Sequence, residues 1–151
     1  MRPARRPRVA LDTYVVFSGI LSRSGPPFEI LHLWHARRFT LVLTEEVNRE
    51  YHRVIVAARS SRKISFRGFD AILFLQLLAI DADWIEVDVA PMIRSRDPND
   101  DKLLSVAFAG QADFLVTGDN DLLDLAADPR LGSVRIVTPG DFLGALNSIL
   151  D

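Results

Sequence analysis

Short, continuous apolar runs alternate with helical segments along this chain, and this alternation is the feature that most limits its fold. The expected strands are residues 8–12, 39–43, 84–87, 114–117 and 134–138. A strand that is apolar on both faces has to be covered on both faces, which is typical of parallel sheets flanked by helices. We therefore predict an α/β fold, a three-layer α/β/α sandwich with a parallel sheet of about five strands.

The segments between the strands carry helix signals. Thr44 is a suitable N-cap, and the pairs Asp97-Pro98 and Thr138-Pro139 each place a capping residue before a proline that fits the first helical turn. The expected helices span residues 13–22, 27–36, 45–58, 66–80 and 98–110, with a short helical turn near 119–125 and a last helix after 138. The helix over 66–80 is an extra element before the third strand.

Length and composition limit the class of protein. The chain has 151 residues, of which 48% are hydrophobic and 25% charged, so we expect a single domain over residues 1–151. The absence of cysteine excludes disulfides and thiolate metal sites. Neither a signal peptide nor a membrane span fits the sequence, and we expect a soluble, cytoplasmic protein without membrane contact.

Acidic residues follow the ends of the predicted strands. Asp12 ends the first strand, and Asp119 comes two residues after the fourth. Glu50 lies in the second turn of the helix after the second strand, and Asp100 in the first turn of the helix after the third. Because ligands bind at the carboxyl ends of parallel strands, these four acids are expected to converge on one pocket.

Helical geometry selects among neighbouring acids. The expected inward stripe of the helix over 45–58 consists of Val47, Tyr51, Val54 and Ala58. Glu50 flanks that stripe, and Asp100 is aligned with Leu104 further along its own helix, whereas Asp101 is rotated to the side. Asp101 and Asp121 stay open as further ligands.

Carboxylates that lie close together repel one another and raise each other's pKa, so such a pocket needs protons or a hard cation. Lys102 is the only Lys or Arg between Arg96 and Arg130. Sites made of oxygen ligands suit Mg²⁺ or Mn²⁺, which commonly act on phosphates. Zinc-site histidines, a P-loop and a dinucleotide-binding motif are not found in the sequence.

In the order of these motifs the chain resembles PIN domains, and more closely the PIN-family toxins of bacterial toxin–antitoxin pairs, the VapC-like and PilT N-terminus group. The resemblance rests on "RVALDTYVVFSGILSRSGPP", "FTLVLTEEVNREYHRVI" and "RDPNDDKLLSVAFAGQADFLVTGDNDLL". It implies a ribonuclease that uses Mg²⁺ or Mn²⁺ to hydrolyse RNA phosphodiesters, is restrained by an antitoxin protein and often forms a homodimer. By this resemblance the metal-binding and catalytic acids are Asp12, Glu50, Asp100 and Asp119.

Thr13, Tyr14 and Thr117 are expected to support these acids. The family's first motif usually reads Asp-Thr-Asn, and here Tyr14 stands in place of the Asn. We expect the Tyr14 ring to pack beside Asp12 or its hydroxyl to bond a carboxylate, which would weaken metal binding and slow cleavage. Two functions therefore stay open: a ribonuclease toxin, or a weakened PIN-like module that binds RNA or an antitoxin without cutting.

Charge is distributed unevenly along the chain. Residues 1–67 contain 13 Lys and Arg against 5 Asp and Glu, a net +8, whereas residues 68–151 contain 5 against 15, a net −10. A polyanion such as RNA would have to meet the basic half. The basic residues expected to face RNA are Arg49, Arg53, Arg59, Arg62 and Lys63.

Overall fold

One parallel sheet forms the centre of the molecule in the computed structural model, which describes residues 5–88, 91 and 93–150. Its five strands are in the order β3-β2-β1-β4-β5. They are β1 (Arg8–Leu11), β2 (Thr40–Leu43), β3 (Asp83–Trp84), β4 (Phe114–Val116) and β5 (Arg135–Val137). All four strand pairings are parallel, so the predicted fold class is confirmed.

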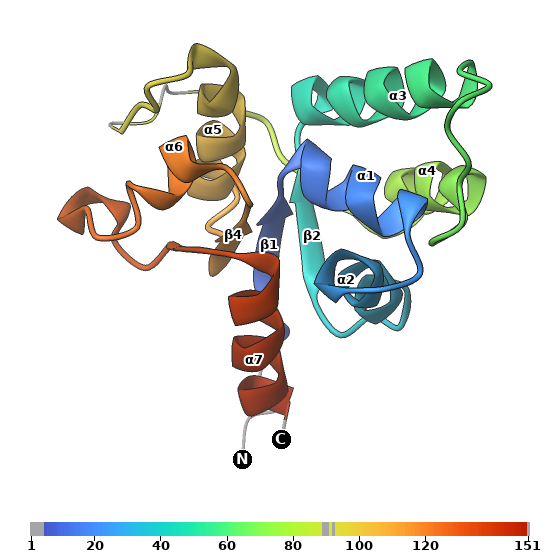
Figure 1. Ribbon diagram of the computed structural model, residues 1–151. Coiled ribbons are helices and arrows are strands. Elements are labelled where there is room, and N and C mark those ends of the chain that lie inside the picture. Colours follow the sequence, from blue (N-terminus) through green and yellow to red (C-terminus); the bar gives the residue numbers. More distant parts are fainter. Residues whose placement is uncertain (1–4, 89–90, 92, 151) are drawn as a thin grey trace.

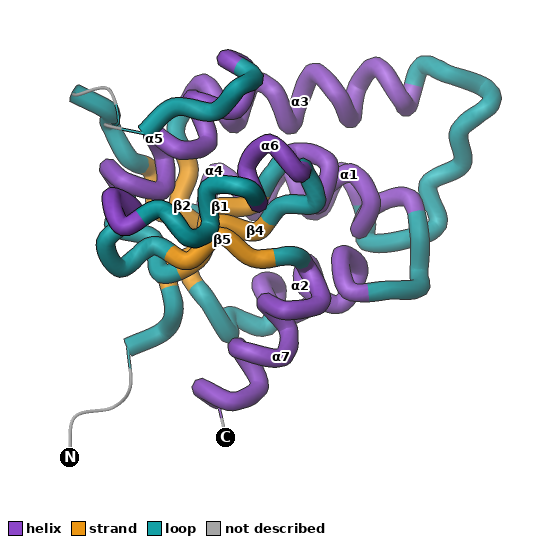
Figure 2. The backbone as a smooth tube through the Cα atoms, turned by 60° about the vertical axis from the view of Figure 1, so that its left-hand side comes forward, coloured by secondary structure: helices purple, strands orange, loops and turns teal. Residues whose placement is uncertain are grey.

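Helices cover both faces of the sheet (Figure 1). Connections from β1 to β2 and β3 run in one direction across the sheet, and those from β3 to β4 and β5 in the other; right-handed crossovers therefore place their helices on opposite faces. One face carries α1 (Thr13–Leu21), α2 (Pro26–His35), α3 (Glu45–Arg59), α4 (Ala71–Asp81) and α7 (Pro139–Leu150). The other carries α5 (Asp101–Ala109) and α6 (Asn120–Leu123). The view in Figure 2 shows the strands enclosed between these two layers.

The core is continuous from one layer to the other. Every residue of β4 is buried, as are the last three residues of β1 and of β2. Phe142 of α7 packs edge-to-face against Phe39 and Phe114, with ring centroids 5.4 and 5.3 Å away. Burial of strands on both faces is the physical reason for the apolar runs in the sequence. No helix in the described ranges has the length and apolarity needed to cross a membrane.

The expected helix over residues 66–80 begins later than predicted, at Ala71. The amides of Gly68 and Phe69 donate to the carbonyl oxygens of Ile20 and Gly19, both at 2.8 Å, so this backbone is bound to the end of α1. A Cβ on Gly68 would lie 2.2 Å from the Gly19 carbonyl oxygen, and only glycine permits this approach. Asp70 then caps α4.

The expected strand over residues 84–87 is shorter and starts earlier than predicted. β3 comprises only Asp83 and Trp84, which pair with Val42 and Leu43 of β2. Ile85 adds one more hydrogen bond, from its amide to the Leu43 carbonyl oxygen. As an edge strand, β3 has a partner on one side only. The pairing ends with Leu43, the last residue of β2, so the predicted strand continued past the residues that pair with β2.

Candidate metal site at the carboxyl edge of the sheet

Asp12 occupies the turn between β1 and α1. Its amide donates to the Val116 carbonyl oxygen at 3.0 Å, which continues the pairing of β1 with β4 by one residue. Its carboxylate caps α1 by accepting from the Tyr14 amide at 3.3 Å. The Thr117 hydroxyl donates to the other carboxylate oxygen at 2.6 Å. Residues from two adjacent strand ends therefore fix the position of this carboxylate.

The surroundings of Asp12 disfavour its charged form. Burial raises its pKa above the ordinary value, while the hydrogen bond from Thr117 opposes the shift. The negative charges of Glu50 and Asp119 raise it further, which places both acids within electrostatic reach. A bound cation would remove this mutual repulsion.

Glu50 points from α3 into the same region. It accepts a 2.7 Å hydrogen bond from the hydroxyl of Thr13, which is buried. The Lys102 ammonium lies 3.1 Å from its other oxygen, and the side chains of Lys102 and Glu50 are only 20% and 23% exposed. The next residue, Tyr51, is fully buried and donates its hydroxyl to the Leu11 carbonyl oxygen at the end of β1. This bond holds α3 against the sheet edge.

The inward stripe of α3 differs from the prediction at one position. Its buried residues are Val47, Tyr51, Ile55 and Ala58. Val54, expected in this stripe, is half-buried and lines the acidic pocket instead.

Asp100 and Asp101 point to different surroundings. Asp100 ends a short 3-10 helix, Pro98–Asp100, and accepts from the Ser95 hydroxyl at 3.2 Å. Burial and the neighbouring charge of Asp119 raise the pKa of Asp100 to about 7. Asp101 accepts from the Ser95 amide at 2.9 Å and lies 3.9 Å from Arg94, in a separate hollow beside Glu46.

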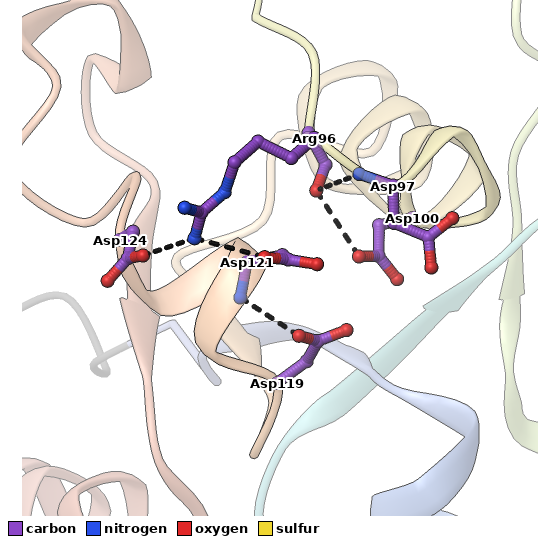
Figure 3. Close-up of polar contacts among 7 residues, drawn as sticks. Arg96, Asp97, Asp100, Asp119, Asp121 and Asp124 are labelled. Atoms are coloured by element: carbon purple, nitrogen blue, oxygen red, sulfur yellow. Dashed lines mark hydrogen bonds and ion pairs between the residues drawn. The ribbon is translucent and has the colours of Figure 1, made fainter.

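A compact acid cluster lies between α5 and α6. Asp100, Asp119 and Asp121 each offer one oxygen within 4.8 Å of the others. Asp119 caps α6 by accepting from the Asp121 amide at 2.9 Å. Figure 3 shows the three carboxylates in this space and Arg96 reaching Asp121 and Asp124. Asp121 is thus shared between the cluster and Arg96, 3.0 Å away.

One pocket of about 280 Å³ contains all four acids expected to converge: Asp12, Glu50, Asp100 and Asp119. Thr13 and Tyr14 line it too, whereas Asp101 and Asp121 are not among its lining residues. A larger, open hollow of about 830 Å³ lies beside Arg23, Arg59 and Arg67 and has a single acid, Asp70. That hollow is larger but has no cluster of acids, so the smaller one is the candidate cation site.

The donors in the small pocket fit a hard divalent ion. They are oxygen atoms, chiefly those of carboxylates, and such ligands are the ones that Mg²⁺ and Mn²⁺ prefer. Asp97 and Asn99 line the pocket in addition to the four expected acids. Burial first, and the charges of neighbouring acids second, raise the pKa values of Asp12 and Asp100, so both effects disfavour the metal-free, charged pocket. Lys102 supplies only part of the compensating charge. The acids that would hold an ion are those of the pocket, with Asp121 at its margin.

Tyr14 does not take the place expected for it. The residue is 73% exposed, so its side chain does not pack into the core beside Asp12. Within the described residues its hydroxyl has no hydrogen bond, and only its backbone amide contacts Asp12. The expectation that the ring packs or competes with a metal for a carboxylate was wrong. In the second position of α1 the side chain points outward from the helix, at the edge of the pocket.

The sequence did not reveal the contacts that Lys102, Ser95 and Tyr51 make in this site. Lys102 follows two acids in sequence, and that spacing does not reveal that it reaches Glu50 on another helix. Ser95 lies in a loop without a pattern, yet it bonds both Asp100 and Asp101. Tyr51 was correctly predicted to be buried, but the hydrogen bond from its hydroxyl to the end of β1 was not predicted. Of these, only Lys102 gave a signal, as the one base in an acidic segment.

The expected RNA-facing residues have different surroundings. Arg49 pairs with Glu45 at 2.7 Å on the exposed face of α3. Arg53 lines the acidic pocket, and its guanidinium lies 3.7 Å from Glu50. Arg59 lines the larger hollow, while Arg62 and Lys63 are exposed in the loop after α3.

This combination, an acidic pocket at the carboxyl edge of a five-stranded parallel sheet, defines an α/β protein with a candidate cation site. A family model described as PIN domain matches residues 8–121, which include all the acids of the pocket. The chain therefore belongs to the PIN domain family, whose members are generally nucleases that depend on divalent metal ions. Comparisons with curated proteins and with solved structures found no match.

Asp100→Asn is expected to stabilise the metal-free protein, and more strongly at pH 8 than at pH 5. The folded-state pKa near 7 lies above that of an unfolded aspartate, near 3.9. Between these values the folded protein holds a proton that the unfolded chain releases, so stability falls as pH rises and the loss is complete above about pH 7. At pH 8 the free energy of unfolding should rise by about 1–2 kcal/mol, less than full linkage because Asp100 is partly exposed.

Urea unfolding in EDTA at both pH values measures this effect. A gain in Asp100→Asn that is equal at pH 5 and pH 8 would contradict the assignment of the repulsion to this carboxyl group.

Proposed function

We propose that this protein is a Mg²⁺- or Mn²⁺-dependent endoribonuclease and the toxin component of a toxin–antitoxin pair. The observation that carries the proposal is the convergence of Asp12, Glu50, Asp100 and Asp119 from four segments on one pocket in a PIN domain. The order of the sequence motifs, which resembles that of PIN-family toxins, supports RNA as the substrate.

The four acids would hold the ion between them. When bound, a divalent ion supplies a water of lowered pKa and neutralises charge that builds up on a phosphodiester. Thr117 and Thr13 orient the Asp12 and Glu50 carboxylates through hydrogen bonds of 2.6 and 2.7 Å. Ser95 does the same for Asp100. These bonds fix the acids before any substrate arrives, which lowers the cost of reorganisation.

The pocket also has groups for the anionic substrate. The Lys102 ammonium in the pocket can attract a phosphate oxygen, and Arg53 at its edge adds a second, more exposed positive charge. Because the Tyr14 hydroxyl has no hydrogen bond to a carboxylate within the described residues, one reason for expecting a weakened site, its competition with the metal, is removed. This favours a nuclease over a module that binds without cutting.

Cleavage of a mixed-sequence single-stranded RNA tests the proposal. Purified protein should cut it with Mg²⁺ or Mn²⁺ and not with EDTA. Asp12→Asn, purified in the same way, serves as the blank, because asparagine is an equally good N-cap and the fold should persist. Cleavage that survives in the blank or in EDTA would trace to a contaminating nuclease and would overturn the proposal.

The toxin role requires a cellular test. Expression of the wild-type chain in bacteria should slow growth, whereas Asp12→Asn should not. The proposed partner is a small antitoxin protein. We also propose a homodimer, because α4 and β3 carry exposed apolar residues, namely Ile72, Ile80 and Trp84. Equal growth of both strains at equal protein levels would exclude toxicity.

A further inference from the structure

Tyr14 is an aromatic side chain with no role in holding the fold together. The residue is 73% exposed, although tyrosines in folded proteins usually bury most of the ring. Its backbone, in contrast, is fixed, because its amide donates to Asp12 in the first turn of α1. An aromatic ring is thus held at the edge of the acidic pocket, two residues from an acid at its centre.

The wall of this pocket also carries a positive charge. Arg53 lines the pocket together with Tyr14, and its side chain is 72% exposed. Its guanidinium lies 3.7 Å from Glu50, a distance at which the charge is still available to a second anion. The half-buried Val54 lines the same pocket.

An exposed aromatic residue and an exposed cation on the wall of one pocket are the two groups that bind single-stranded nucleic acids. The base stacks on the ring, and the backbone phosphate meets the cation. In a duplex the faces of the bases are already stacked on their neighbours, so a single ring at a surface cannot reach them. The arrangement therefore selects an unpaired nucleotide.

We infer that Tyr14 is the stacking platform for an unpaired base next to the phosphate that enters the acidic pocket, with Arg53 contacting the adjoining backbone. The inference rests on the proposed function, because it takes the pocket as the place where RNA is cut. It assigns to Tyr14 the selection of single-stranded over paired substrate. It requires little sequence preference, because every base offers a π-face.

Anisotropy of a fluorescein-labelled oligoribonucleotide in millimolar Ca²⁺ measures binding apart from cleavage. A series of oligonucleotides, each with one abasic position, locates the stacked base. We expect one abasic position to weaken binding to the wild type about tenfold. The same abasic position should weaken binding to Tyr14→Phe equally, because the ring is kept. Tyr14→Ala should bind the intact oligonucleotide weakly, and the abasic position should weaken its binding no further. The loss caused by removing the base should therefore depend on whether the ring is present. A merely structural role of Tyr14 would not produce this dependence.

Val56→Ala is the matched control, because it removes an exposed side chain of α3 (55%) that does not line the pocket. It should bind like the wild type. The melting temperature of each variant, measured in the same buffer, shows whether the fold is kept. Tyr14→Ala should melt near the wild type, since little of the ring is buried.

The outcomes separate this inference from the proposed function. If Tyr14→Ala binds and cuts RNA like the wild type, or keeps the abasic effect, the stacking role is overturned and the nuclease remains; the ring would then be free for a protein partner. If the ring–base coupling is found but no RNA is cut in Mg²⁺ or Mn²⁺, the stacking role stands and the nuclease proposal fails. If the wild type binds no oligonucleotide, both are overturned.

Discussion

Asp100→Asn is expected to lower the rate of metal-dependent RNA cleavage by at least about 100-fold, whereas Asp101→Asn should stay within about threefold of the wild type. The two residues are adjacent in sequence, but only Asp100 lines the acidic pocket and lies in the three-acid cluster. Asp101 accepts from the Ser95 amide outside the pocket. An asparagine oxygen can accept the same hydrogen bond, so Asp101→Asn should keep the loop in place.

Cleavage rates at saturating Mn²⁺ and the metal-induced change in melting temperature are the two readouts. A ligand that binds only the folded state stabilises it by about 2.7 kcal/mol at 100 times its dissociation constant, which raises Tm by several degrees. Asp100→Asn should lose most of this rise, and Asp101→Asn should keep it. The reverse pattern would make Asp101 the ligand, and equal losses would show that the loop containing Ser95, not one carboxylate, determines the site.

The strands could be predicted where helices bury both faces of the sheet, because such strands consist of continuous apolar runs. The central strands β1, β2 and β4 are apolar apart from the first residue of β1 and of β2, because helices cover both of their faces. Their positions were predicted to within one residue at each end. The pattern failed at the edge strand β3, where only two residues pair with β2, although it placed the other edge strand, β5, to within one residue at each end. The start of α4 failed for another reason, since Gly68 contacts the backbone of α1 and no local pattern encodes a contact 48 residues away.

The acids of the pocket could be selected from sequence because strand ends and helix phase are local properties. Asp12 and Asp119 follow strands that lie side by side, and the phase of α3 directed Glu50 to the same place. Asp100 was expected in the first turn of a helix that begins at Pro98; it ends a 3-10 helix just before α5 and still lines the pocket. The orientation of Tyr14 could not be selected in this way. The sequence placed Tyr14 at the start of a helix, next to Asp12. Whether its ring turns toward the core depends on the space that the packed side chains leave, which no local pattern shows.

Lys102 is the residue whose effect on metal binding is hardest to read from sequence. Its ammonium lies 3.1 Å from Glu50 in a pocket that has to accept a cation. In the metal-free protein it offsets part of the repulsion among the acids, and toward an incoming cation it is itself repulsive. Removing it should therefore move the stability of the metal-free protein and the affinity for metal in opposite directions.

Lys102→Met, which keeps the length of the apolar side chain, is expected to bind Mn²⁺ about 10-fold more tightly and to lower the Tm of the metal-free protein. Arg53→Met is the matched control, because it removes a positive charge that lies 3.7 Å from the same Glu50 oxygen. Arg53 is exposed and its charge is screened by solvent, so this substitution should change Mn²⁺ affinity by less than about twofold. Calorimetric titration with Mn²⁺ and melting in EDTA measure the two quantities. If Lys102→Met binds Mn²⁺ no better than Arg53→Met, the ammonium does not oppose the ion, and the ion's position lies away from Glu50, nearer to Asp100, Asp119 and Asp121.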